Sequence, residues 1–153
     1  MCCVNVTLTQ LHPNSWGYLQ CFHLLCEMFD FYPSLQSFLH YYSVSLGTPI
    51  CWMSLVCQFG CVLFSPYIIS YKWFKTGFFR VTIESSGCKY FYYGDVPKFP
   101  FYWTSDPVYY LHWPRSSMSN EDQVIFNLFY SLPRRLPTRK LLSSIFAINI
   151  RLI

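Results

Sequence analysis

Polar and small residues recur every three or four positions across residues 11–30, and this spacing predicts a helix with one solvent-facing stripe. The stripe consists of Gly17, Gln20, His23, Glu27 and Asp30. The opposite side is apolar and contains Trp16, Leu19, Phe22, Leu25, Cys26 and Phe29. Asn14 or Ser15 is expected to be the N-cap, because either side chain can accept a backbone hydrogen bond there. A second, shorter helix is expected to begin at Pro33 and Ser34, with an apolar face of Leu35, Phe38, Leu39 and Tyr42.

From Pro49 the period changes to two, which is typical of a strand with alternating faces. One face of this first strand carries Cys51, Met53, Leu55, Cys57 and Phe59. A second strand is predicted over residues 78–84, where apolar residues alternate with the polar Arg80, Thr82 and Glu84. A third, short strand is expected around residues 101–103, after a loop-rich stretch punctuated by Gly87, Gly94, Pro97 and Pro100.

The C-terminal part of the chain predicts helices again. Ser119 is a suitable N-cap, because Asp122 stands at the third helical position and Glu121 also lies near the positive end of the helix dipole. The apolar stripe of this helix is expected to be Val124, Ile125, Leu128 and Phe129, and Pro133 ends it. A last short helix is expected over residues 136–145. The chain is therefore predicted to be α+β, with N-terminal helices, a small antiparallel sheet in the middle and C-terminal helices.

The composition supports a packed domain. The chain has 153 residues, of which 53% are hydrophobic, 22% aromatic and 12% charged. The charged share is about half of the usual 25%, and no glycine period exists, so intrinsic disorder, collagen and coiled coil are excluded. A chain of this length is expected to form one domain.

Charge is distributed unevenly along the chain. Residues 1–71 carry only Glu27 and Asp30, whereas the remainder holds all 11 basic and five of the acidic side chains. The densest basic group comprises Arg134, Arg135, Arg139 and Lys140. These four are the candidate nucleic-acid-binding residues, because clustered cations attract a phosphate backbone. The alternative is an ordinary solvated face.

Aromatic residues suggest a second binding hypothesis. The runs Tyr90–Tyr93, Phe101–Trp103 and Tyr109–Trp113 are interleaved with Lys89, Lys98 and Arg115. Rings beside cations suit single-stranded nucleic acid, because its bases can stack on them. Packing within a core or a sheet is the alternative explanation for the same rings.

No catalytic, cofactor-binding or metal-binding residue is predicted. Asp95, Asp106 and Glu121 could be nominated for metal-dependent strand transfer, but Glu121 is already explained by helix capping. The run from Tyr92 to Asp95 offers one acid and is expected to be a loop.

The eight cysteines lack the close pairing of a zinc site. They are expected to be reduced thiols of an intracellular protein, because no signal peptide is evident. A thiol–imidazole pair between Cys57 and either His23 or His40 is left open.

Residues 50–71 form an uncharged stretch of 22 residues, which is long enough to cross a membrane. A small membrane protein is therefore an alternative. The polar residues in this stretch and its period of two favour a strand instead. Ser54, Gln58 and Ser65 are among these polar residues.

A series of short strings occurs in a fixed order between residues 11 and 145. They are Leu11-His12-Pro13-Asn14-Ser15-Trp16, Phe22 to Cys26, Pro33-Ser34 with Phe38, Trp52 with Ser54-Leu55, Ser70-Tyr71-Lys72 with Phe74-Lys75, Phe78-Phe79-Arg80-Val81, Phe99-Pro100-Phe101-Tyr102-Trp103, and Leu132 to Leu142. In order and spacing these strings resemble the plant gypsy-type transposase family of retrotransposon-derived proteins. The resemblance implies one domain at 11–145, an N-terminal extension at 1–10 and a tail at 146–153.

The resemblance also implies a non-catalytic, retroelement-derived domain, because that family offers no established catalytic residues to transfer. Its expected partners are nucleic acid or another element-encoded protein, and the nucleus is one expected location. Members of the family usually carry more sequence before the first string, so the chain resembles a truncated fragment. We therefore expect Phe22 and Leu25 to lose their cover and to form an exposed apolar patch.

Overall fold

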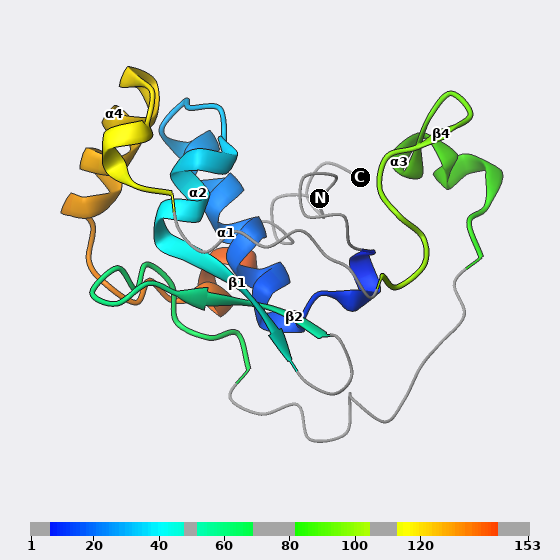
Figure 1. Ribbon diagram of the computed structural model, residues 1–153, viewed down its shortest axis with the longest axis horizontal. Coiled ribbons are helices and arrows are strands. Elements are labelled where there is room, and N and C mark those ends of the chain that lie inside the picture. The colour runs from blue at the N-terminus through cyan, green and yellow to red at the C-terminus, as the bar shows by residue number, and fades with distance from the viewer. Residues whose placement is uncertain (1–6, 48–51, 69–81, 105–112, 144–153) are drawn as a thin grey trace.

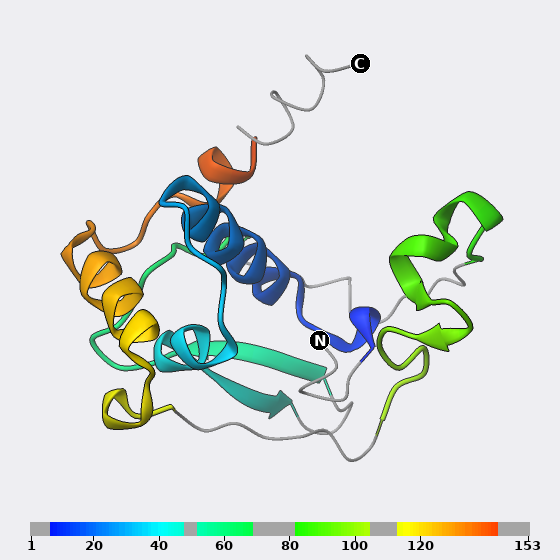
Figure 2. The same ribbon diagram turned by 90° about the horizontal axis from the view of Figure 1, so that it is seen from above.

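The computed structural model describes residues 7–47, 52–68, 82–104 and 113–143. It has the predicted α+β fold (Figure 1), with helices toward both ends and a small antiparallel sheet between them. The main elements are α1 (Pro13–Met28), α2 (Leu35–Tyr41), β1 (Tyr42–Gly47), β2 (Trp52–Cys57) and α4 (Asn120–Ser131). Helix α1 packs against β2, and α4 packs against α2 (Figure 2). Residues 138–143 are helical, inside the range predicted for the last helix.

Helix α1 begins with His12 as its N-cap. The Nδ1 atom of His12 accepts a hydrogen bond from the Asn14 backbone N–H at 3.1 Å. Pro13 occupies the first helical position, where a backbone N–H would have no partner within the helix. The prediction of Asn14 or Ser15 as N-cap is wrong, because both side chains make tertiary hydrogen bonds instead. Asn14 bonds the backbone N–H and C=O of Ile68, each at 2.9 Å.

The C-terminal end of α1 is a left-handed cap. Asp30 has a φ of 59°, and its N–H donates to the Glu27 carbonyl at 3.1 Å. The Phe31 N–H donates to the Cys26 carbonyl at 2.8 Å. This pair of bonds satisfies two of the last carbonyls of the helix and turns the chain toward α2.

Gly17 does not belong to the solvent stripe, contrary to the prediction. It is buried, and a Cβ at this position would lie 3.2 Å from Thr138 Cγ2 and 3.4 Å from Tyr67 Cβ. The other members of the predicted stripe are exposed. A side chain here would crowd Thr138, because the chain after α4 crosses α1 at this point.

The β1–β2 hairpin is antiparallel, with Val44 opposite Leu55. Strand β2 lies where the period of two predicts a strand. The pattern does not predict β1, because Tyr42 fits the apolar face of the preceding helix as well as the start of a strand. The outer edge of β2 holds the start of α1: the His12 N–H donates to the Met53 carbonyl at 2.7 Å, and the Leu55 N–H donates to Ser15 Oγ at 2.8 Å.

The uncharged stretch 50–71 contributes β2 and then an irregular segment through its described residues. Met53, Leu63 and Phe64 in this stretch are fully buried. Within the parts of the chain that the structure describes, no helix has the length and apolar character needed to cross a membrane.

The core is largely aromatic. Phe22 of α1 meets Phe38 edge to face at a centroid distance of 5.1 Å and Phe129 of α4 at 5.5 Å. Tyr42 stacks on Phe38 at 4.9 Å. The expectation that Phe22 and Leu25 lie exposed is wrong, since the exposed fraction of Phe22 is 2% and that of Leu25 is 4%. Phe38 of α2 and Phe129 of α4 cover Phe22.

One buried carboxylate joins the N-termini of α2 and α4. Ser34 caps α2 and Ser119 caps α4, the second as predicted. The Ser119 hydroxyl donates to Asp122 Oδ2 at 2.8 Å, and the Ser34 hydroxyl donates to Asp122 Oδ1. Asp122 is only 6% exposed. The two serine hydroxyls therefore replace the hydrogen bonds to water that the carboxylate loses on burial.

The inward face of α4 differs by one residue from the predicted stripe. Ile125 and Phe129 are buried as expected, but Val124 is 52% exposed and Phe126 is buried in its place. The reason is that Asp122 also points inward, and residues 122, 125, 126 and 129 share one face of a helix.

Residues 82–104 form a separate aromatic lobe, on the other side of α1 from α4 in both views (Figures 1 and 2). It contains the short helix α3 (Cys88–Phe91) and a hairpin of β3 (Tyr92–Tyr93) and β4 (Val96–Pro97). The run from Tyr92 to Asp95, predicted as a loop, is therefore a strand and its turn, with Gly94 at a φ of 60°.

The strand predicted around residues 101–103 is not found, and the strand predicted over residues 78–84 lies mostly outside the described residues. Residues 101–103 are irregular, because Phe101 packs on Phe99 at 5.7 Å and Trp103 packs edge to face on Trp52 at 5.5 Å, so the rings point to different partners. Of the strand predicted over residues 78–84, residues 82–84 are irregular and 78–81 lie outside the described residues. Gln10, which precedes α1, ties the lobe to the N-terminal segment through two hydrogen bonds to the Thr104 backbone, at 2.7 and 3.1 Å.

The left-handed residue after α1 gives a first prediction. Replacing Asp30 by Gly should raise the free energy of unfolding by about 1 kcal/mol, because glycine removes the Cβ that disfavours positive φ. The Asp30→Ala control removes the same charge but keeps a Cβ, so it should stabilise less. Urea denaturation measures both. Equal stability of the two variants would contradict this account of the cap.

The shared carboxylate gives a second prediction. Asp122→Ala should lower the free energy of unfolding by about 2–3 kcal/mol, because both capping hydroxyls lose a charged acceptor. The neighbouring Glu121 is exposed, so Glu121→Ala should change stability by no more than about 0.5 kcal/mol. Thermal and urea unfolding of the pair test it, and similar losses in both variants would count against the role of Asp122.

Candidate nucleic-acid interface

The predicted basic residues lie on the connecting segment, residues 132–140, which follows α4 and includes the first residues of the helical stretch 138–143. This segment runs parallel to residues 62–67 and pairs with them at a bridge between Leu136 and Phe64. The Leu136 N–H donates to the Leu63 carbonyl at 2.8 Å, and the Ser65 N–H donates to the Leu136 carbonyl at 2.9 Å. Backbone pairing therefore fixes the segment on the core.

A buried threonine anchors the end of the connecting segment. Thr138 is fully buried, and its hydroxyl donates to the Ser65 carbonyl. Its own carbonyl accepts a weak hydrogen bond from the Cys21 thiol at 3.8 Å. Because Thr138 also packs against Gly17, the segment is fixed immediately before Arg139.

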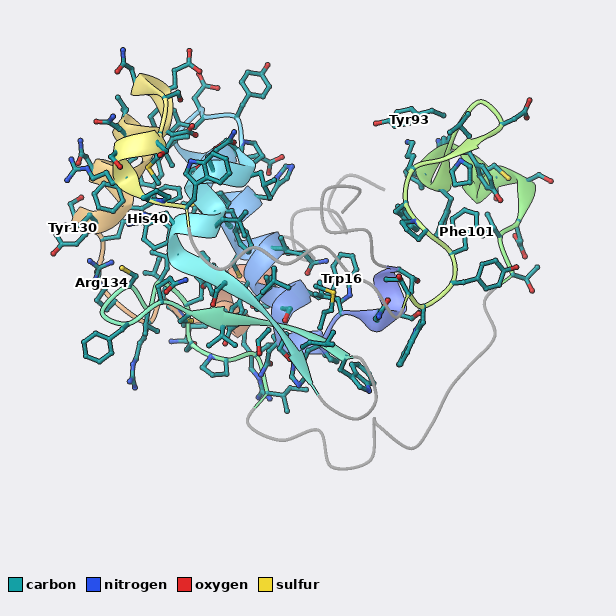
Figure 3. The ribbon with its side chains drawn as sticks, in the orientation of Figure 1. Trp16, His40, Tyr93, Phe101, Tyr130 and Arg134 are labelled. Atoms are coloured by element: carbon teal, nitrogen blue, oxygen red, sulfur yellow. The ribbon has the colours of Figure 1, made fainter. Side chains whose placement is uncertain are left out.

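The structure brings all four predicted residues to this one segment, and all four are exposed. The guanidinium carbon of Arg134 lies 4.6 Å from the centroid of the Tyr130 ring. Arg139 donates from Nε to the Tyr67 carbonyl at 2.7 Å, and its guanidinium carbon lies 5.6 Å from the centroid of the same tyrosine ring. Figure 3 shows Tyr130 and Arg134 together at the C-terminal end of α4.

Sequence reasoning missed a ladder of cations and rings along α4. The guanidinium carbon of Arg115 lies 4.6 Å from the Phe126 centroid, and Phe126 lies 5.6 Å from Tyr130 at an interplanar angle of 36°. Arg134 completes the ladder on the Tyr130 ring. The spacing of four between residues 126 and 130 was a usable signal for the pair of rings, because such positions lie above one another on a helix, but Arg134 lies beyond the end of α4. Nothing local predicts that Arg115 joins them.

The charge of this region is positive. Residues 113–143 contain five basic and two acidic side chains, a formal charge of +3. Asp122 is buried beneath two serine hydroxyls and Glu121 lies in the first turn of α4, at the opposite end from Arg134. Among the described residues, neither Arg134 nor Arg135 lies within 4.0 Å of a carboxylate. These two charges are therefore open to an outside anion.

The aromatic lobe places its cations on rings as well. Lys98 Nζ lies 4.4 Å from the Tyr93 centroid and donates to the Lys89 carbonyl at 2.6 Å. Glu84 and Asp95 balance the two lysines, so residues 82–104 carry no net charge. Arg115 does not join this group, and residues 109–112 of the third predicted run lie outside the described residues.

The residues considered for catalysis do not converge. Asp95 lies in the β3–β4 turn and Glu121 in α4, while Asp106 lies outside the described residues. In the described part of the chain, no group of three or more histidine, cysteine or acidic side chains could hold a metal ion.

Cys57 has the environment of an inert thiol. Burial raises the pKa of Cys57, and its interactions are with Tyr42 and Cys61 rather than with a histidine. A nucleophilic cysteine needs the opposite change, because only the thiolate reacts. His23 pairs with Glu27 at 3.3 Å on the exposed side of α1, and His40 Nδ1 lies 3.1 Å from a backbone carbonyl.

The buried thiols give a third prediction. Cys21 and Cys26 are free, and burial raises the pKa of each from its ordinary value of 9.0 to about 11. Between these values the folded chain holds more protons than the unfolded chain. The free energy of unfolding should therefore fall as the pH rises above about 9, by about 1 kcal/mol for each thiol at pH of about 10.

Urea denaturation at pH values of about 8 and about 10 tests this. Cys21→Ala should reduce the loss between the two pH values, whereas Cys88→Ala should not, because Cys88 is exposed. A loss of the same size in both variants would show that the buried thiols are not responsible.

Comparison with known proteins identifies no relative of this chain. No family model, curated protein or solved structure matches the chain. The resemblance to the gypsy-type transposase family therefore stays a prediction from the strings quoted above, and the function has to be argued from the site itself.

Proposed function

We propose that the chain is a non-catalytic, retroelement-derived domain that binds nucleic acid through its basic surface. The basic surface comprises Arg134, Arg135, Arg139 and Lys140 with the rings of Tyr130 and Tyr67. The observation that carries the proposal is that exposed arginines sit on a segment fixed by backbone pairing, two of them held over tyrosine rings. The quoted strings support the retroelement origin.

The physical argument rests on the phosphate backbone. Lysine and arginine displace the counterions that surround nucleic acid, and this release supplies most of the free energy of sequence-independent binding. A cation that is already held in place loses less conformational entropy on binding than a free side chain. Arg139 is such a cation, since it is bonded to the Tyr67 carbonyl and lies near the same ring.

The proposal extends to partners and location. A domain of this kind would act beside other element-encoded proteins on the nucleic acid of the element. A nuclear location belongs to the same proposal, because an integrated element resides in chromosomal DNA.

The fourth prediction concerns the salt dependence of binding. Fluorescence anisotropy with a labelled single-stranded oligonucleotide of about 20 bases should give a dissociation constant of roughly 10⁻⁴–10⁻⁶ M that rises with salt. Each contact to a phosphate contributes about 0.7 to the slope of log K against log salt concentration for single strands. Arg135→Gln with Arg139→Gln should therefore lower the slope by roughly 1.4.

The matched control removes two cations from the aromatic lobe. Lys89→Gln with Lys98→Gln deletes the same charge, and the slope should not change, because acidic residues already neutralise that lobe. Absence of binding by the wild-type chain at low salt, or equal slopes for both double variants and the wild type, would refute the proposal.

A further inference from the structure

We infer that Arg134, lying over Tyr130, is a stacking platform for one base of single-stranded nucleic acid, so that the basic surface prefers single strands to duplex. The inference rests on the proposed function and deepens it, because a row of positive charges alone would bind either form. It concerns the shape of the site rather than its charge.

The platform is built from the core outward. Phe126 is 7% exposed, packs edge to face on His40 at 4.7 Å and lies 5.6 Å from Tyr130. Tyr130 is 59% exposed and carries the Arg134 guanidinium at 4.6 Å. Successive layers thus run from a buried ring to an exposed cation, since Arg134 is exposed.

A guanidinium over a ring can take a base on its other side. The group is planar, delocalised and weakly hydrated, and nucleic-acid-binding proteins stack unpaired bases on aromatic rings and on arginine planes. The contact with the Tyr130 ring restrains the position of the guanidinium. Arg134 lies next to Arg135, which is exposed and can contact the adjoining phosphate, so a base and its backbone would find complementary groups side by side.

The strand preference follows from access to the faces of the bases. In a duplex each base is covered by its neighbours, so only the phosphates reach the basic surface. In a single strand a base can turn out and stack.

The aromatic lobe does not offer the same platform. Its Tyr93 is 73% exposed, but the cation above it is the ammonium of Lys98, which has no planar face. Asp95 follows two residues later in the turn and repels phosphate. The comparison isolates the arginine plane as the feature that matters.

The experiment exchanges arginine for lysine, which keeps the charge and removes the plane. Wild type, Arg134→Lys and Arg135→Lys are titrated against one labelled strand and against the same strand annealed to its complement, at one salt concentration. Arg134→Lys should weaken binding to the single strand by roughly five- to tenfold and leave duplex binding within about twofold. Arg135→Lys keeps the charge of a residue that lies on no described ring, so any change in affinity should be equal for the single strand and the duplex.

A second variant tests the ring beneath. Tyr130→Leu should reproduce the loss of single-strand preference while keeping the slope of the salt dependence, and Tyr130→Phe should retain the preference. Far-UV circular dichroism checks that each variant is folded.

The outcomes separate the inference from the proposed function. Salt-dependent binding with no preference for single strands, or equal effects of Arg134→Lys and Arg135→Lys, would overturn the platform and leave phosphate binding intact. No binding of either form by the wild type would overturn both.

Discussion

The carboxylate of Asp122 is the contact on which the arrangement of helices depends. It accepts hydrogen bonds from the capping hydroxyls of two helices that are far apart in the chain, Ser34 of α2 and Ser119 of α4. A buried charge is tolerated only when it is well hydrogen-bonded. A shift of either helix would therefore leave the buried carboxylate without one of its hydrogen-bond donors. The position of α4 sets the position of the cation–aromatic ladder and of the segment that follows it.

The composition of the chain favours contacts between cations and aromatic rings. It has many rings and few acids, so several cations lie over aromatic rings instead of pairing with carboxylates. Arg115, Arg134 and Arg139 each lie over a ring. Such contacts are worth about 0.5–1 kcal/mol at exposed sites and leave the cation charged and accessible. The same feature therefore contributes modestly to stability and makes the surface suitable for an anionic partner.

Sequence reasoning succeeded where one local rule decides the structure. Ser119 followed by Asp122 caps α4 as predicted, and the period of two marks the strand β2. It failed where a distant partner decides. Asn14 is not the N-cap, because Ile68 takes both atoms of its amide, and Gly17 is buried because residue 138 crosses it. No period within the helix reports either contact.

The candidate site divides in the same way. Its charges lie close together in the sequence, so the sequence alone identifies Arg134, Arg135, Arg139 and Lys140. What turns them into a surface comes from elsewhere in the chain: the backbone of residues 62–67 fixes the segment, and Tyr67 receives Arg139. Local sequence thus specifies which charges are present, while tertiary pairing specifies their geometry. A charge cluster on a mobile tail could attract phosphate, but only a cluster held on the core can present a defined plane to a base.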